Sequence, residues 1–309
     1  MLPGVLILAL LSGCAAGASG SRTGMDRLTG ADGTAAEPAV TYEVASRELP
    51  LRDPGRATDP TPGSAGDDAA AGRDLPTTVW APRTGEGPFP VVVFSHGLLS
   101  EPSAYEELLA GWAAAGLVVA APAYPLTRLG SDGVFADVPN QPADVSFVLD
   151  EVLALGTTDG DPLAGRVDPS RVAVAGHSAG AITSLGLLSS CCRDERVTAA
   201  VVLAGSARVF DGDFADPGVP TLFVHGSRDD VLPLAEGTSV AAAAPGPTAF
   251  LELADADHSA PYDDAGSPWF ATVAGATTAF LRWALADDAA ALDELRAVGD
   301  GLATDELPR

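Results

Sequence analysis

The sequence contains no lysine. All 17 basic residues are arginines, which excludes chemistry that needs a primary amine, such as a Walker-type phosphate site, a Schiff base or a Ser-Lys dyad. Basic residues are also outnumbered, because 42 acidic side chains bring the formal net charge to −25. A surface this acidic repels phosphate backbones and anionic bilayers. We therefore expect no nucleic-acid partner.

Cysteine is scarce, with three residues, at positions 14, 191 and 192. No C-x-x-C pair and no Cys/His ligand spacing is present, so the sequence does not support a structural zinc site. Adjacent cysteines form a disulfide only with unusual strain. We expect Cys191 and Cys192 to be two small buried residues after a helix, and we expect neither a metal nor a cofactor.

Long hydrophobic runs are missing as well. The start, "MLPGVLILALLSGC", holds an apolar run of about nine residues, whereas a membrane span needs about 20. This pattern predicts a signal peptide over residues 1–13. Residues 11–14 resemble the bacterial lipobox, which implies a lipid on Cys14, although no basic residue precedes the apolar run. We expect an exported protein, either anchored in the cell envelope at Cys14 or secreted, with a buried N-terminal strand as the alternative.

The 309 residues are enough for one large α/β domain with additional ends. Residues 14–39 are small and polar and lack periodicity, which predicts a flexible tether. Residues 40–290 carry the pattern of one folded α/β domain. Residues 291–309 are expected to form a helical tail.

Eight short segments have the character of strands. They cover residues 41–49, 75–82, 91–95, 117–122, 171–176, 199–205, 221–226 and 249–254. The first two are expected to form a hairpin, and the other six are apolar without alternation, as in a parallel sheet that is buried on both faces. Because helical segments separate them, the sequence predicts an α/β fold with a mostly parallel, doubly wound, eight-stranded sheet. Catalytic groups in such sheets lie in loops at the carboxyl ends of strands.

One of these loops is "GHSAG", residues 176–180, between an expected strand and an expected helix. It matches the G-x-S-x-G nucleophile elbow in the strand-turn-helix setting that this motif requires. Glycines are needed on both sides of the serine, because larger side chains would collide with neighbouring elements in so sharp a turn. Ser178 is therefore the candidate nucleophile, and a purely structural turn is the alternative.

A serine hydroxyl needs a base, and the base needs an acid that orients it. The chain order in this fold is Ser, acid, His, and of four histidines only His258, in "DADHSAPYDD", follows a plausible acid. That acid lies in "HGSRDDVLP", where the spacing favours Asp229 over Asp230. His177 and His225 are expected to have structural roles.

An attacked carbonyl develops negative charge, which two backbone N–H groups usually stabilise. The candidates are the N–H groups of Ala179, directly after the serine, and Leu98, in the loop after the strand at 91–95. Only about fifteen residues separate the strands at 199–205 and 221–226, too few for a cap domain of the size that a separate folded unit needs. We expect no large cap domain and an open cleft. Loop 123–139 is either a partial lid or an ordinary crossover. The candidate pocket residues are Leu99, Tyr124, Leu126, Phe135 and Ser206.

These motifs resemble those of the α/β-hydrolase fold. More narrowly, the sequence is similar to a secreted bacterial esterase group that includes cutinase-like polyester hydrolases, chlorophyllase-like enzymes and platelet-activating-factor acetylhydrolase-like proteins. The similarity covers residues 40–290 and rests on "LPTTVWAP", "VVVFSHG", "DPSRVAVAGHSAG", "VPTLFVHGSRDDVLP" and "DADHSAP". The resemblance implies a Ser178–His258–Asp229 triad.

Three positions depart from the polyester-degrading branch of that group. The branch usually has an aromatic residue where Leu98 stands, a methionine where Ala179 stands and a tryptophan where Ser206 stands. The aromatic clamp for terephthalate-like rings is therefore missing, and the substrate class is less well defined than the reaction.

The sequence thus predicts a serine esterase, a carboxylic-ester hydrolase that acts through an acyl-enzyme. We expect a monomer that takes a small-molecule, lipid or polymer ester and that contacts a membrane only through the N-terminal lipid. Two alternatives stay open. One is an amidase or peptidase with the same triad, and the other is a catalytically silent, lipid-anchored binding protein.

Overall fold

The computed structural model describes residues 40–58, 70–210, 212–299, 302–303 and 307. These residues belong to one compact unit. The expected signal peptide 1–13, the lipidation candidate Cys14 and the tether 14–39 lie outside the described residues.

A single mixed sheet forms the centre of this unit, with the strand order β1-β2-β4-β3-β5-β6-β7-β8-β9. The strands are β1 Val44–Asp53, β2 Arg73–Pro82, β3 Phe89–Ser95, β4 Val118–Pro122, β5 Val167–His177, β6 Val197–Leu203, β7 Thr221–Gly226, β8 Thr248–Leu253 and β9 Leu302–Ala303. β3 to β8 are parallel, whereas β2 is antiparallel to both β1 and β4. All eight expected strands are present, including the early hairpin, and the doubly wound α/β fold is confirmed. A short antiparallel β9 extends the sheet beyond β8.

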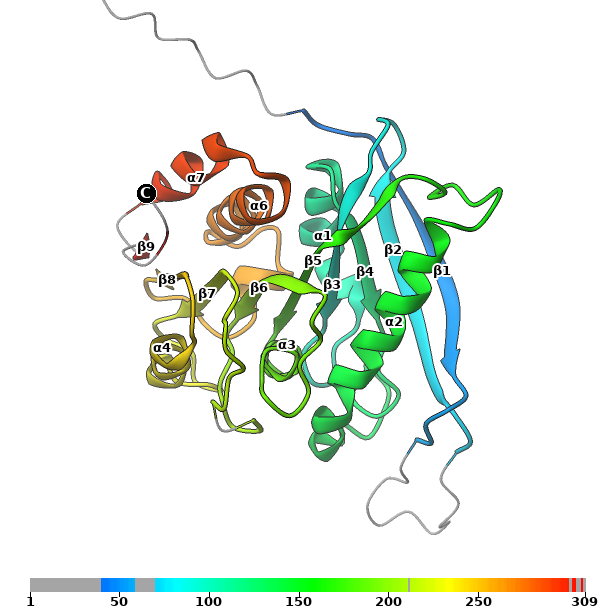
Figure 1. Ribbon diagram of the computed structural model, residues 1–309. Coiled ribbons are helices and arrows are strands. Elements are labelled where there is room, and N and C mark those ends of the chain that lie inside the picture. The colour runs from blue at the N-terminus through cyan, green and yellow to red at the C-terminus, as the bar shows by residue number, and fades with distance from the viewer. Residues whose placement is uncertain (1–39, 59–69, 211, 300–301, 304–306, 308–309) are drawn as a thin grey trace, which may run out of the picture. The chain divides into compact units, whose positions relative to one another are not determined.

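Helices cover both faces of the sheet (Figure 1). They are η1 Pro102–Tyr105, α1 Glu106–Ala114, η2 Phe135–Asn140, α2 Gln141–Leu155, α3 Ala179–Gly186, α4 Leu234–Ala243, α5 Ala260–Asp263, α6 Phe270–Ala286 and α7 Ala289–Arg296. On one face, Phe94 of β3 belongs to the same apolar cluster as Trp112 of α1 and Phe280 of α6. On the other face, Val93 packs with Val148 of α2. Successive residues of a strand therefore pack against opposite helix layers, which explains why the strands lack in/out alternation.

The last described residues pack against this sheet. α7 begins after Asp288, whose side chain accepts hydrogen bonds from the N–H groups of Ala290 and Ala291. Leu292 and Leu295 of α7 are buried in the cluster that also holds α6. The tail expected to be helical is thus part helix and part strand, because β9 pairs with β8.

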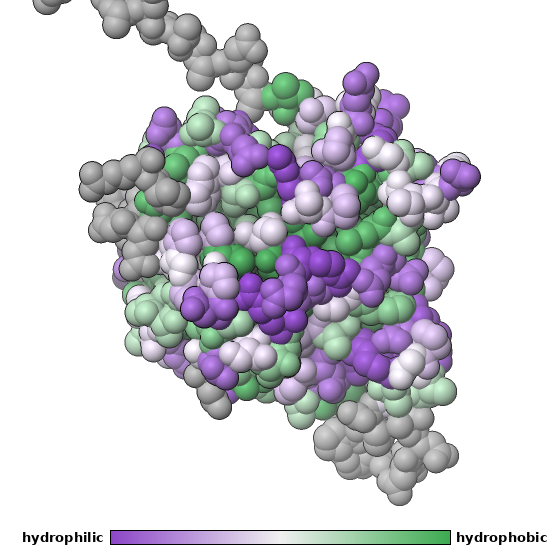
Figure 2. All heavy atoms as spheres, in the orientation of Figure 1, coloured by the Kyte–Doolittle hydropathy of each residue, from purple (hydrophilic) through white to green (hydrophobic). Residues whose placement is uncertain are grey.

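In the orientation of Figure 1, hydrophilic residues gather across the middle of the visible face, with hydrophobic ones beside them (Figure 2). No helix among the described residues combines the length and the apolarity that a bilayer span requires.

A buried ion-pair cluster joins the first hairpin to the crossover after β4. Arg73 of β2 is 1% exposed, and its guanidinium donates two hydrogen bonds to Asp137 of η2 and two to Asp144 of α2, all between 2.7 and 3.0 Å. Although burial lowers the pKa of Arg73, the two carboxylates raise it more. A buried cation is tolerated only when it is paired in this way. The cluster fixes η2, and with it Phe135, against the sheet.

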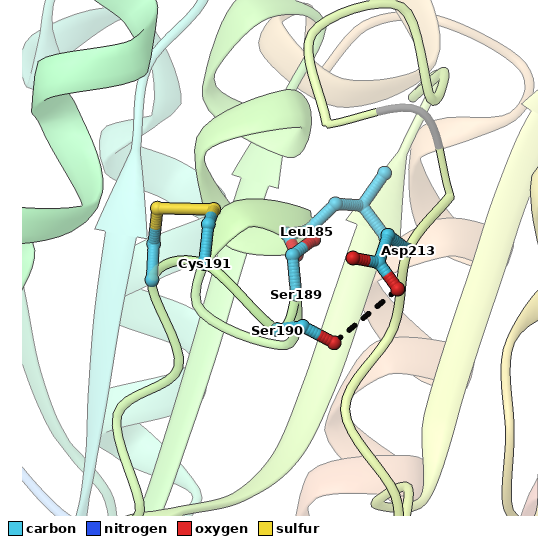
Figure 3. Close-up of a disulfide and its surroundings, with 6 residues drawn as sticks. Leu185, Ser189, Ser190, Cys191 and Asp213 are labelled. Atoms are coloured by element: carbon cyan, nitrogen blue, oxygen red, sulfur yellow. Dashed lines mark hydrogen bonds between the residues drawn. A yellow bond between two sulfur atoms is a disulfide. The ribbon is translucent and has the colours of Figure 1, made fainter.

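The expectation for the adjacent cysteines was wrong. Cys191 is exposed and forms a disulfide with Cys192, with 3.8 Å between their Cα atoms (Figure 3). The two residues follow the end of α3 in a turn, where the backbone can bring neighbouring side chains together. Ser190 in this turn is bonded to the segment after β6, through its N–H to Asp213 O at 2.8 Å and through its hydroxyl to Asp213 Oδ1 at 3.3 Å.

Candidate active site

The elbow has the sharp geometry that its glycines predict. Ser178 has φ 56° and ψ −120°, a left-handed conformation that non-glycine residues rarely adopt. Its N–H donates to Leu203 O at 3.0 Å, which holds the turn against β6. A Cβ on Gly176 would overlap the backbone of Gly180, and a Cβ on Gly180 would overlap the backbone of Ser95. The close approach of β3, β5 and α3 therefore requires glycine at both positions.

Ser178 is the first member of a hydrogen-bonded chain of three side chains. Its Oγ lies 2.8 Å from His258 Nε2, and His258 Nδ1 lies 2.7 Å from Asp229 Oδ2. Since a carboxylate can only accept, Nδ1–H donates to Asp229, and Nε2 is left to accept the serine proton. The fold thus brings together, from the loops after β5, β7 and β8, the three side chains that the sequence singled out.

Asp229 is held as an anion by its surroundings. Its Oδ1 accepts the N–H groups of Val231 and Leu232 at 2.9 and 2.7 Å, and its Oδ2 lies 3.3 Å from His225 Nε2. Burial acts to raise the pKa of Asp229, but the hydrogen bonds from His225, His258 and Leu232 hold it well below its usual range. Asp230 is exposed, and so it is Asp229 that contacts His258.

The side chain of His177 points away from the serine oxygen, as its sequence position predicts. It contacts the backbone of His258 and the side chain of Tyr105 instead. Its Nε2 lies 2.7 Å from His258 O, and its Nδ1 lies 2.8 Å from the Tyr105 hydroxyl, which also accepts the N–H of Gly97 at 3.3 Å. Burial, followed by the proximity of His258, lowers the pKa of His177 to about 3. The ring is therefore neutral, with Nε2–H donating to His258 O and Nδ1 accepting from Tyr105.

The loop after β3 is fixed by a second neutral histidine. His96 Nδ1 lies 2.7 Å from Gly97 O, while its Nε2 accepts the N–H of Tyr124 at 3.1 Å, and burial lowers the pKa of His96 to about 4. The next residues turn sharply, because Leu99 has φ 56° and donates its N–H to Thr127 O at 2.7 Å.

Two backbone N–H groups beside the serine stay available to a ligand. Among the described residues, the N–H groups of Leu98 and Ala179 donate to no protein acceptor. Ala179 is the first residue of α3, where the partial positive charge of the helix terminus favours an anion. The site therefore has unused donors where the sequence predicts them.

A cavity of about 330 Å³ opens at Ser178. Its lining consists of Leu98, Phe135, Ser178, Ala179, Ile182, Arg208, Val231, Leu232 and His258. Of the five candidate pocket residues, only Phe135 belongs to this lining. Tyr124 is fully buried and its hydroxyl is bonded to Ser95 Oγ at 2.7 Å, so its selection as a pocket residue was wrong. Ser206 is 1% exposed.

Leu99 and Leu126 lie on the two loops beside the cavity rather than in its wall. Leu99 is 48% exposed, and its side chain packs so closely on Gly133 that a Cβ there would come within 2.9 Å. Leu126 O accepts the N–H of Val134 at 2.8 Å. Loop 123–139 is thus tied to the loop after β3 and contributes a wall, through Phe135.

The sequence reasoning missed four lining residues. Ile182 lies one helical turn after Ser178, a spacing that places both on one face of α3. Val231 and Leu232 directly follow the predicted acid, so their presence near the site was also inferable. Arg208 carried no such signal, because its place depends on how the chain turns after β6, where Ala204 has φ 48°.

The described part of the chain contains no group of three or more His, Cys, Asp or Glu residues that could hold a metal ion. The site is built from a hydroxyl, an imidazole, a carboxylate and backbone N–H groups. Such a set can move a proton and stabilise an oxyanion without a cofactor.

One of the comparisons with known proteins identifies the family of this chain. No curated protein matches the sequence. The family model described as PET hydrolase-like matches residues 74–290, which is more than half of the 309 residues and includes every residue of the hydrogen-bonded chain. The chain belongs to the PET hydrolase-like family, a family of α/β hydrolases that cleave esters.

Proposed function

We propose that the protein is a serine esterase that cleaves carboxylic esters through an acyl-enzyme. The observation that carries this proposal is a pair of linked hydrogen bonds. One joins Ser178 Oγ to His258 Nε2 at 2.8 Å, and the other joins His258 Nδ1 to Asp229 Oδ2 at 2.7 Å. Ser178 and His258 line a cavity with an apolar wall. A nucleophile, a base and an orienting acid within hydrogen-bond distance are the arrangement that activates a serine.

In the first half of the reaction, Ser178 Oγ attacks the ester carbonyl while His258 Nε2 takes its proton. Asp229 stabilises the imidazolium that forms, and the N–H groups of Leu98 and Ala179 bind the oxyanion. The imidazolium then protonates the leaving alkoxide, which departs as an alcohol. In the second half, His258 activates a water molecule that attacks the acyl-enzyme, and Ser178 regains its proton as the carboxylic acid is released.

The test is turnover of short p-nitrophenyl esters by the full chain and by two serine variants. Ser178→Ala is expected to lower kcat by a factor of 10³ or more, whereas Ser239→Ala, at an exposed serine of α4, should leave kcat unchanged. A fluorophosphonate probe should label the peptide that contains Ser178. Wild-type turnover in Ser178→Ala would overturn the proposal, and failure of the probe to label would favour a silent binding protein.

Ester substrates are preferred over amides in this proposal. An amide needs protonation of a poorer leaving group, although the same three side chains could supply it. Aminoacyl anilides assayed beside p-nitrophenyl esters separate the two. Faster turnover of the anilides would assign the protein to the amidases or peptidases.

We also propose that the protein acts outside the cytoplasm, as a monomer anchored by lipid on Cys14 or released. The support is the apolar start and the lipobox-like residues 11–14 of the sequence. Metabolic labelling with an alkyne fatty acid should mark the wild type but not Cys14→Ser. If neither the wild type nor Cys14→Ser is labelled, the lipid anchor is contradicted and the protein is proposed to be released.

A further inference from the structure

The cavity at Ser178 has one polar lining residue that the proposed reaction does not use. Six of its nine lining residues are apolar, two are Ser178 and His258, and the last is Arg208. Its side chain is half exposed, so the guanidinium can keep its charge in contact with solvent. What Arg208 could bind depends on which of its N–H groups are already paired.

The partner is Glu236 in the first turn of α4. Arg208 Nε donates to Glu236 Oε2 at 2.7 Å, and Nη2 donates to Glu236 Oε1. This two-bond contact fixes the plane of the guanidinium. Among the described residues nothing accepts a hydrogen bond from Nη1 of Arg208, whose side chain is 51% exposed. Two N–H bonds thus remain for a bound molecule.

The charge of the pair limits what that molecule can be. Hydrogen bonding raises the pKa of Arg208 and lowers that of Glu236, so both groups are ionised at neutral pH and their charges cancel. An uncharged oxygen acceptor can bind Nη1 without meeting net repulsion. A carboxylate at the same place would meet the attraction of Arg208 and the repulsion of Glu236 together, on a protein whose formal net charge is already −25, so its charge gains little there to offset the loss of its hydration.

We propose that the Arg208–Glu236 pair is a specificity site that binds a second, uncharged oxygen acceptor of the substrate, such as another ester carbonyl, and selects against a carboxylate in its place. This inference rests on the proposed function and adds the substrate class. The cavity volume of about 330 Å³ lies at the lower end of the range for small-molecule sites. That size suits a small aliphatic diester.

The experiment compares three methyl esters of matched length. The first is the dimethyl ester of succinate, glutarate or adipate, and the second is the corresponding monomethyl half-ester, which has a free carboxylate. The third is an aliphatic monoester without a second carbonyl. For the wild type, kcat/KM should be highest for the diester. In Arg208→Leu the ratio of diester to monoester should fall about tenfold or more, the loss expected for one charge-assisted hydrogen bond. Monoester turnover should fall less than diester turnover, because the monoester has no second carbonyl for Arg208 to bind.

The second variant tests the charge argument directly. Glu236→Gln leaves Arg208 without its neutralising partner, so kcat/KM for the half-ester should rise about fivefold relative to the diester. Arg83→Leu, which removes a 63% exposed arginine paired with Glu43 on the first hairpin, is the matched control and should change no ratio.

The possible failures are distinguishable. Unchanged ratios in Arg208→Leu, with all turnover still dependent on Ser178, would overturn this inference and leave the esterase intact. An equal loss on the monoester would assign Arg208 to the support of the cavity wall and also overturn it. Absence of Ser178-dependent hydrolysis of every ester would overturn the proposed function itself.

Discussion

His177 Nε2 lies 2.7 Å from the backbone oxygen of His258. The residue before the elbow serine thus holds the backbone of the histidine whose ring contacts that serine. Through Nδ1, His177 also reaches the Tyr105 hydroxyl, which accepts the N–H of Gly97. One neutral imidazole therefore connects the loop after β3 with the loop after β8, and the two halves of the candidate site are not independent.

Removal of the Tyr105 hydroxyl tests this connection. Tyr105→Phe leaves the buried Nδ1 of His177 without its donor, which should lower the free energy of unfolding by about 1–3 kcal/mol. We expect kcat to fall about tenfold with KM less affected, because the positions of Gly97 and His258 bear on the reacting groups more than on substrate binding. Steady-state kinetics and urea unfolding measure both effects.

Tyr262→Phe is the matched control for Tyr105→Phe. Tyr262 is equally buried and its ring also packs on His177, with 4.9 Å between centroids, but its hydroxyl donates only to Val224 O at 3.2 Å. Its kcat should stay within about twofold of wild type. Equal losses of kcat in both variants would show that the effect is not specific to the hydroxyl bonded to His177, and would contradict the connection through Tyr105.

Asp229 and Asp230 provide a second matched pair. Asp229→Asn should lower kcat about a thousandfold or more, because the amide no longer holds His258 in the tautomer that accepts the serine proton. Asp230→Asn changes an exposed side chain and should have no effect on kcat. Comparable activity of the two variants would contradict the assignment of Asp229.

Acid should destabilise the protein through its two buried neutral histidines. The folded-state pKa values of His96 and His177 are about 4 and about 3, against 6.5 for an ordinary histidine. Below pH 6.5 the unfolded chain therefore binds more protons than the folded one, and the free energy of unfolding decreases as the pH falls. Each histidine contributes a slope of at most about 1.4 kcal/mol per pH unit between pH 6 and 4.

Urea unfolding at several pH values measures this slope. The carboxyl groups of Asp144 and Asp263, whose pKa values are raised by burial, act in the opposite direction. The informative quantity is therefore the difference between wild type and a histidine variant. His96→Asn or His177→Asn should reduce the slope of unfolding free energy against pH by the amount that corresponds to about one bound proton. An unchanged slope in both variants would contradict the neutral state of these rings.

Two glycines are expected to respond in opposite ways to replacement by alanine, because one is closely packed and the other has open space around it. Gly180→Ala should lower the free energy of unfolding by about 3 kcal/mol or more, because its Cβ would overlap the backbone of Ser95. Gly111 lies in α1 with nothing within 4 Å of an added Cβ. Gly111→Ala should raise the free energy of unfolding by about 0.5–1 kcal/mol. Thermal or urea unfolding decides both signs.

The adjacent cysteines are predicted to be oxidised in the purified protein. The peptide that contains Cys191 and Cys192 should have a mass about 2 Da lower before reduction than after it, and it should resist alkylation until a reductant is added. Cys191→Ser/Cys192→Ser should show no such mass change. Alkylation of both thiols without reduction would contradict the disulfide.

The sequence alone determined the sheet and the turn that carries Ser178. Strand segments, their parallel character and the G-x-S-x-G turn are local patterns, because burial on both faces and tight turns constrain the residues at those positions themselves. The order Ser, acid, His follows from the same topology, and so Ser178, Asp229 and His258 could be selected before any distance was known.

Only the tertiary structure decided what surrounds them. Tyr124 lies on the loop next to the site, yet it is buried against Ser95, whereas Arg208 reaches the cavity from a turn with no motif. Likewise, the contact of Tyr105 with His177 spans 72 positions. Such contacts depend on how elements far apart in the sequence pack, and a side chain's direction in a loop is set by those neighbours rather than by the residues beside it.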